Sequence, residues 1–280
     1  MKKNIILTII FCFIFKIPIS IAKENLSLNF DDIDVVLTGN FIQGGLAIGK
    51  TNSSAPINFK NRELRKSKDG LFVIGFGRDH PQNANLTLKV NNKLITKSFK
   101  IQKRIYKTQK INGLQKKMVT PPKFFWDRIK KENKIIKEVR SLNSNVDFVF
   151  QKFTWPAQGI ISGVFGSQRI LNGKPKRPHY GIDIAAKKGA TVVAPTESIV
   201  RMAEKDLYYT GGTIMLDHGH GLTSVYSHLS SINVKVGDKI LKNQKIGEVG
   251  STGRSTGPHL DWRVNWFDQR LDPLLLLENK

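Results

Sequence analysis

Residues 213–226 read TIMLDHGHGLTSVY, in which two apolar segments flank a short loop rich in glycine and histidine. The flanking segments suit β-strands, and a glycine-containing loop between two strands is typical of a β-hairpin. Similar segments occur at residues 191–194, 197–200 and 245–249, with glycine and proline frequent between them. Because no helical periodicity of useful length interrupts these segments, the sequence predicts an antiparallel β domain over residues 151–280.

The preceding part of the chain has β character as well. Within residues 23–112, short apolar stretches such as 71–74 and 86–90 are separated by turn-forming residues, which predicts a small antiparallel β-sandwich. Apolar residues then recur at near-helical spacing among many lysines, which predicts an amphipathic helix at about 123–142 inside a linker of residues 113–150. We therefore expect a mainly β fold with an N-terminal sandwich, a linker helix and a C-terminal antiparallel core.

The N-terminus is typical of an export signal. Lys2 and Lys3 precede an apolar run over residues 5–15, and residues 20–22 form a small-x-small cleavage site. We expect a signal peptide of residues 1–22 to be removed, and the alternative is an uncleaved N-terminal anchor. The protein is then exported to the periplasm or the cell envelope.

The composition limits which partners the protein can attract and which kinds of metal site it can form. The chain of 280 residues has 45 Lys+Arg against 22 Asp+Glu, and a formal net charge of +23. A surface this basic attracts polyanions, and after export these are the cell wall and anionic lipid headgroups rather than nucleic acid. A general lysine bias explains the charge equally well. The single cysteine excludes an intramolecular disulfide and thiolate-rich zinc sites, so nitrogen and oxygen must hold any metal.

Two pairs of histidine and aspartate stand out in the C-terminal half. His179 and Asp183 are four residues apart, and on a strand they reach one metal ion only if the chain bends, which Gly181 allows. His259 and Asp261 are two residues apart and face the same side of a strand. Imidazole and carboxylate are zinc ligands, and a catalytic zinc keeps three protein ligands.

The order of these motifs resembles that of the lysostaphin-type zinc metallopeptidases, which cut peptide bonds in peptidoglycan. The resemblance covers nearly all of residues 155–275. The matching segments include ISGVFG at 161–166, HYGID at 179–183, DHGHG at 217–221, YSHL at 226–229 and TGPHL at 256–260. Residues 23–112 resemble the Ig-like β module that precedes the peptidase core in some members.

The resemblance implies a role for each residue of the motifs. His179 and Asp183 are expected to bind one zinc ion. His228 is expected to act as a catalytic base or transition-state stabiliser, a role that suits a group whose ordinary pKa is near neutral. His259 is expected to donate a hydrogen bond to the developing oxyanion. The family's third zinc ligand is the second histidine of a His-x-His motif, and that position here is Asp261.

The aspartate at this position leaves three interpretations of the site. In the first, Asp261 binds the metal, and the neutral His–Asp–Asp set weakens zinc as a Lewis acid and makes Mn²⁺ more competitive. In the second, His218 or His220 replaces Asp261 as the ligand. In the third, the site holds little metal and the protein only binds peptidoglycan.

The sequence therefore predicts a zinc-dependent metalloendopeptidase that hydrolyses peptide bonds in peptidoglycan cross-links or stem peptides. The alternative is a non-catalytic peptidoglycan-binding or amidase-activating relative with an impaired metal site. The sequence indicates neither which peptide bond is cleaved nor the oligomeric state. It also leaves open whether the linker helix or the first domain covers the site.

Overall fold

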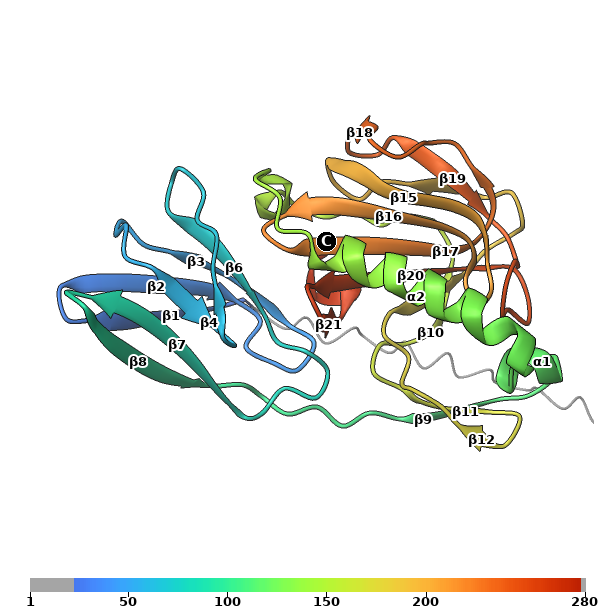
Figure 1. The fold of residues 1–280 in the computed structure, drawn as a ribbon, viewed down its shortest axis with the longest axis horizontal. Helices are drawn as coiled ribbons and strands as arrows, with labels where there is room; N and C mark the ends of the chain where they lie inside the picture. The colour runs from blue at the N-terminus through green and yellow to red at the C-terminus, as the bar shows by residue number, and fades with distance from the viewer. Residues whose placement is uncertain (1–22, 278–280) are drawn as a thin grey trace, which may run out of the picture.

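The computed structural model describes residues 23–277, so the expected signal peptide at 1–22 lies outside the described residues. The fold is mainly β with antiparallel sheets, which confirms the predicted fold class. Figure 1 shows a smaller β unit beside a larger one, with the linker strand β9 and the helix α2 running along the larger unit. Within the described residues, no helix combines the length and apolar character needed to cross a bilayer.

The N-terminal unit consists of two four-stranded antiparallel sheets. The first has the order β1 (Glu24–Phe30), β2 (Ile33–Gly39), β3 (Leu46–Lys50) and β6 (Leu71–Gly75). The second has the order β5 (Arg62–Glu63), β4 (Ile57–Phe59), β7 (Asn83–Val90) and β8 (Lys93–Lys100). In β7 every second residue, from Ala84 to Leu88, is buried, so one face of the strand packs on the core and the other meets solvent.

Residues 108–141 pack onto the C-terminal unit. Strand β9 (Thr108–Ile111) lies in the range that the sequence assigns to the first domain, yet it pairs in parallel with β11 (Gln168–Leu171). β11 also pairs with β12 (Lys174–Pro175). The chain then forms α1 (Lys116–Val119), the 3-10 turn η1 (Lys123–Phe125), α2 (Trp126–Ser141) and η2 (Phe148–Phe150). The apolar side of α2 packs on the large sheet through Ile135, Ile136 and Val139.

The C-terminal unit is built on one large sheet with the order β10-β13-β20-β17-β16-β15-β18. Its strands are β10 (Ile160–Gly163), β13 (Ile182–Ala185), β15 (Ser198–Leu207), β16 (Gly211–Gly219), β17 (Leu222–Ile232), β18 (Lys239–Ile240) and β20 (His259–Trp266). β14 (Thr191–Val193), β19 (Lys245–Val249), β21 (Gln269–Leu271) and the 3-10 turn η3 (Pro273–Leu275) complete the unit. β16 and β17 are the antiparallel hairpin that residues 213–226 predict.

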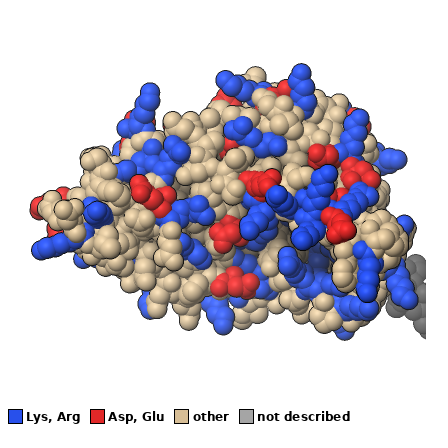
Figure 2. Space-filling model, viewed as in Figure 1, with Lys and Arg blue, Asp and Glu red and all other residues tan. Residues whose placement is uncertain are grey.

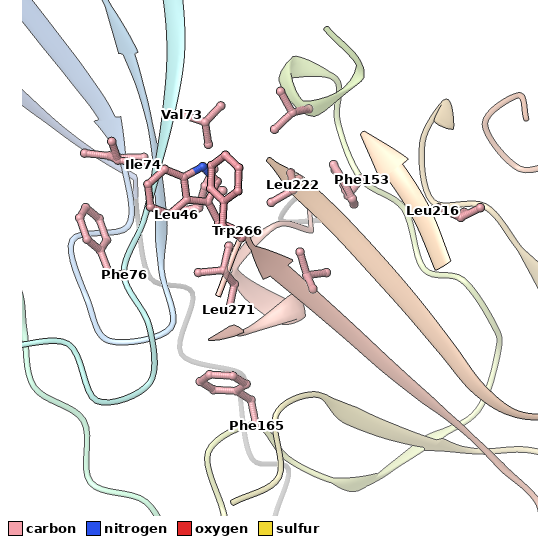
Figure 3. Close-up of a cluster of buried hydrophobic side chains, with 14 of the residues drawn as sticks. Leu46, Val73, Ile74, Phe76, Phe153, Phe165, Leu216, Leu222, Trp266 and Leu271 are labelled. Carbon is pink, nitrogen blue, oxygen red and sulfur yellow. The ribbon is translucent and has the colours of Figure 1, made fainter. Parts of the chain in front are cut away.

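The two units share a continuous apolar core. Figure 3 shows Trp266, at the end of β20, beside Val73 and Ile74 of the N-terminal sheet. The Trp266 side chain is 2% exposed, and a Cβ on Gly75 of β6 would lie only 2.7 Å from its Cβ. An ion pair of 2.8 Å between Arg104 and Asp272 adds a second link. The strand β20, which carries much of the candidate site, is therefore anchored at its far end by the N-terminal unit.

Candidate metal centre

Strand register places two carboxylates side by side. β13 and β20 are antiparallel neighbours, and Asp183 lies directly opposite Asp261 in their register. Directly opposed residues project from the same face with Cβ atoms about 5 Å apart. On the other side of β20, Ser227 of β17 is also opposite Asp261. The sheet therefore holds the two aspartates on one face without any contribution from a flexible loop.

His179 joins this pair from the segment that leads into β13. Its amide donates to the Ser167 carbonyl and its carbonyl accepts from the Gly166 amide, both at 2.8 Å. Its side chain is fully buried, and Nε2 is 3.1 Å from Oδ1 of Asp183. One donor atom from each of His179, Asp183 and Asp261 lies within 4.8 Å of the others. The structure therefore brings together the three residues that the sequence analysis assigns to the metal.

Two glycines make room for the cluster. A Cβ on Gly163 of β10 would lie 2.2 Å from Oδ2 of Asp183. A Cβ on Gly181 would lie 2.4 Å from the Trp262 carbonyl oxygen and 3.1 Å from Oδ1 of Asp261. Any other residue at either position would displace a carboxylate or a strand. Gly181 is needed here because the chain passes close to β20.

The polar atoms of the cluster are suited to a cation. Both ring nitrogens of His179 and Oδ1 of Asp183 are buried without a hydrogen-bond partner among the described residues. Leaving such atoms unpaired costs about 1–3 kcal/mol each. A cation between them would bind the imidazole nitrogen and the carboxylate oxygens, and so would supply the partner that these atoms lack. One nitrogen and carboxylate oxygens are donors that Zn²⁺ accepts and that Mn²⁺ accepts as well, so these residues fit the metal that the family resemblance implies.

Two arginines contact the carboxylates. Nη2 of Arg169 is 2.6 Å from Oδ2 of Asp183. Nε of Arg263 is 2.9 Å from Oδ1 and 3.1 Å from Oδ2 of Asp261, and its Nη2 also donates to Oδ2. Burial alone raises the pKa of Asp261, but the charge and hydrogen bonds of Arg263 outweigh it and hold that pKa well below its usual value. Burial also raises the pKa of Asp183, but the neighbouring His179 and Arg169 outweigh it and lower that pKa, so both aspartates are ionised and available as ligands.

Sequence reasoning missed both arginines. Arg263 is two residues after Asp261 on a strand, so the period-two alternation was a signal that the side chains share a face. Arg169 lies on β11 and Asp183 on β13, two strands of different sheets, and no local pattern indicates their contact.

His228 and His259 lie next to the cluster, with ring centroids 4.7 Å apart. Nδ1 of His228 is 2.7 Å from the Thr252 carbonyl oxygen, and Nδ1 of His259 is 2.8 Å from the Gly257 carbonyl oxygen. A carbonyl only accepts, so each imidazole carries a proton on Nδ1, and in the neutral ring Nε2 keeps its lone pair. His228 has φ of +65°, a left-handed conformation that is uncommon outside glycine and recurs at functional sites.

Burial changes the acidity of His228. Removal from water lowers its pKa to about 4, below the near-neutral value that the sequence analysis expects for a catalytic base. The His228 ring is therefore neutral at pH 7, with Nε2 free to accept a proton. His259 is less buried, with a side chain 17% exposed, and its Nε2 is 3.8 Å from Oδ1 of Asp183.

A cavity of about 270 Å³ gives access to the site, and its lining includes Asp183, His228 and His259. The linker forms another part of the wall, through Ile111 of β9 and Leu114. Asn172 holds Leu114 in place, because Nδ2 donates to the Leu114 carbonyl at 2.7 Å and Oδ1 accepts from the Leu114 amide at 3.3 Å. Residues 109–114, which precede helix α2, therefore border the cavity, and α2 does not line it.

The two alternative histidines lie elsewhere and have other partners. Nε2 of His218 is 2.7 Å from the Ser224 hydroxyl, and its Nδ1 is 3.2 Å from the Glu197 carbonyl oxygen. Nε2 of His220 is 2.8 Å from Oδ1 of Asp147. Neither belongs to the cluster of His179, so the structure gives no support to a replacement of Asp261 by either of them.

Comparisons with known proteins agree with this geometry. The model of peptidase family M23 matches residues 177–273. The chain is 40% identical over 130 residues to an uncharacterized metalloprotease of Haemophilus influenzae, which covers 45% of this chain and 26% of the relative. It is 37% identical over 117 residues to the peptidoglycan DD-endopeptidase ShyA of Vibrio cholerae, which covers 41% of this chain and 27% of the relative. The chain thus spans about a quarter of the length of these curated relatives.

A solved structure resembles the fold of this chain over both units. A Pseudomonas aeruginosa structure described as a peptidase M23 superposes with a TM-score of 0.66 and covers 84% of this chain and 94% of that chain. Its sequence identity is 23%, so it bears on the fold alone. The family match includes Asp183, His228 and Asp261 with the strands that hold them. The C-terminal unit of this chain therefore contains a domain of peptidase family M23, matched over residues 177–273.

Proposed function

We propose that this protein is a metal-dependent endopeptidase that hydrolyses peptide bonds in peptidoglycan. The observation that carries the proposal is the buried cluster of His179, Asp183 and Asp261 next to a cavity lined by His228 and His259. The naming of a relative as a peptidoglycan DD-endopeptidase supports a cross-link or stem peptide as the substrate.

The donor set favours one Zn²⁺ per chain, with Mn²⁺ as the competing ion. A divalent ion held there would polarise the scissile carbonyl and make a water molecule more acidic. His179, Asp183 and Asp261 would hold the ion. Their positions are fixed by β13, β20 and the Ser167 carbonyl, so no loop has to order before the ion binds.

His228 and His259 then have different roles in the reaction. His228 is neutral at pH 7, and its Nε2 accepts the proton of the attacking water and later passes it to the leaving amine. For His259 to donate from Nε2 to the developing oxyanion, its ring must carry a second proton, because Nδ1 already donates to Gly257. Its partial exposure leaves room for that charge to be solvated.

The basic surface supports an anionic partner. Figure 2 shows Lys and Arg side chains spread over the face that carries α2, with fewer Asp and Glu side chains among them. Together with the expected signal at residues 1–22, this supports a place in the periplasm or cell envelope, with peptidoglycan as partner and a peripheral contact with anionic lipids.

Incubation of the full chain with purified peptidoglycan, followed by mass analysis of the released muropeptides, tests the proposal. We expect cleaved cross-links or shortened stem peptides with the wild type, and none after chelation or with His179→Ala. The matched control is His80→Gln, which changes a buried histidine of the N-terminal unit and should leave the products unchanged. Products that persist with rigorously metal-free protein would refute the metal-dependent function.

A further inference from the structure

Asp261 and Arg263 form an ion pair that is held by more than one hydrogen bond. The two residues lie two positions apart on β20, and both nitrogens Nε and Nη2 of Arg263 donate to the carboxylate. The Asp261 side chain is 1% exposed, whereas that of Arg263 is 27% exposed. The buried negative charge of Asp261 is thus compensated by the guanidinium of a side chain that is itself only partly exposed.

The charges around the site cancel in pairs. Asp261 is paired with Arg263, and Asp183 is paired with Arg169 at 2.6 Å. These four side chains therefore have no net charge before a cation binds. A divalent ion at this site would keep its positive charge, which differs from the neutral centre that the ligand types alone imply. The sequence expectation of a weakened Lewis acid is incomplete, because it counts the ligands without the arginines.

We propose that Arg263 is a positioning residue of the metal centre, and that Asp261 and Arg263 together act as one neutral ligand. This inference rests on the proposed metal-dependent function. A carboxylate has about four lone-pair positions. Oδ1 of Asp261 accepts from Nε of Arg263 alone, so it keeps a lone pair for the ion while the guanidinium fixes the plane of the carboxylate.

The ion pair between Asp261 and Arg263 determines how replacement of Asp261 by histidine affects zinc binding. Asp261→His supplies an imidazole, the usual third ligand in the resembled family, but it leaves Arg263 without its carboxylate. An unpaired guanidinium next to a divalent cation repels it, and in a partly buried site that repulsion is strong. Asp261→His alone therefore weakens zinc binding, and Arg263→Gln in the same chain restores it.

The test is the zinc dissociation constant of the full chain, measured by competition with a chromophoric chelator. We expect Asp261→His to bind zinc more than about tenfold more weakly than the wild type. We expect Asp261→His with Arg263→Gln to return within about threefold of the wild type. The matched control is Asp261→His with Arg270→Gln, which removes a guanidinium from the adjacent strand β21 that contacts Asn265 instead of the cluster. That control should bind zinc as weakly as Asp261→His alone.

Asp261→His binding zinc as tightly as the wild type, or equal rescue by Arg270→Gln, overturns the inference. Circular dichroism follows folding. If Asp261→His folds only when Arg263→Gln accompanies it, the pairing is supported. If neither the single variant nor the double variant folds, the pairing is contradicted. A wild type that binds no zinc refutes the proposed function along with this inference, whereas normal zinc binding by the wild type with no dependence on Arg263 refutes the inference alone.

Discussion

Acid should destabilise the fold through His218, and the size of the effect follows from its surroundings. His218 is fully buried on β16, and burial lowers its pKa from 6.5 to about 4. Its Nδ1 donates to the Glu197 carbonyl, and its Nε2 accepts from the Ser224 hydroxyl, so the neutral ring is fully paired. Protonation of Nε2 would break the bond from Ser224 and place a charge in the apolar core.

The sign of the effect is set by which state binds more protons. Between pH 6.5 and 4 the unfolded chain protonates this histidine and the folded chain does not, so stability falls as the pH falls through this window. The loss from His218 alone is about 3 kcal/mol on going from pH 7.5 to pH 4. Above pH 6.5 both states are neutral at this residue and the contribution vanishes.

Urea unfolding of wild type and His218→Gln in the presence of a chelator measures this contribution. The chelator removes the separate pH dependence of metal binding. A constant offset between the two proteins reports lost packing, and only the change of that offset with pH reports the histidine. We expect the wild type to lose about 3 kcal/mol more than His218→Gln between pH 7.5 and pH 4. Parallel stability curves for the two proteins would refute the reasoning.

Trp266→Ala should lower the free energy of unfolding by about 3–5 kcal/mol in urea denaturation, because the indole is buried between the two units; a loss well under about 1 kcal/mol would contradict this. Asn172→Ala removes both hydrogen bonds to Leu114, so limited proteolysis should cut residues 112–120 faster than in the wild type, and an unchanged rate would show that other contacts hold the linker. His228→Gln should lower kcat on peptidoglycan by about 10²–10⁴-fold while the zinc dissociation constant stays within about threefold, and loss of zinc would make His228 a ligand instead of a base.

Much of the fold follows from local patterns. Alternating apolar segments around residues 217–221 predict the β16–β17 hairpin, and its formation depends only on neighbours in the sequence. The same alternation places His259 and Asp261 on one face of β20. Local patterns do not predict that Asp183 lies opposite Asp261, because this depends on the register of two strands that are distant in the sequence. The family resemblance assigns both aspartates to one metal, but it does not give this register.

Most of the features that the sequence did not predict are non-local, and Arg263, two residues after Asp261 on β20, is the exception. Arg169 meets Asp183 across two strands, and Leu114 reaches the cavity because β9 pairs in parallel with β11. Parallel pairing has no local sequence signal, so the pairing of β9 with β11 does not follow from the sequence. The low pKa of His228 has the same origin, since it depends on how completely the surrounding strands exclude water.

X-ray absorption at the zinc edge of the full chain loaded with one equivalent of zinc tests the central claim most directly. We expect one imidazole nitrogen at about 2.0–2.1 Å, with oxygen ligands completing the shell and no sulfur. Asp261→Asn should reduce the number of protein oxygens or release the ion. A shell with two or more imidazoles, or a chain that takes up no zinc, would contradict a centre made of His179, Asp183 and Asp261.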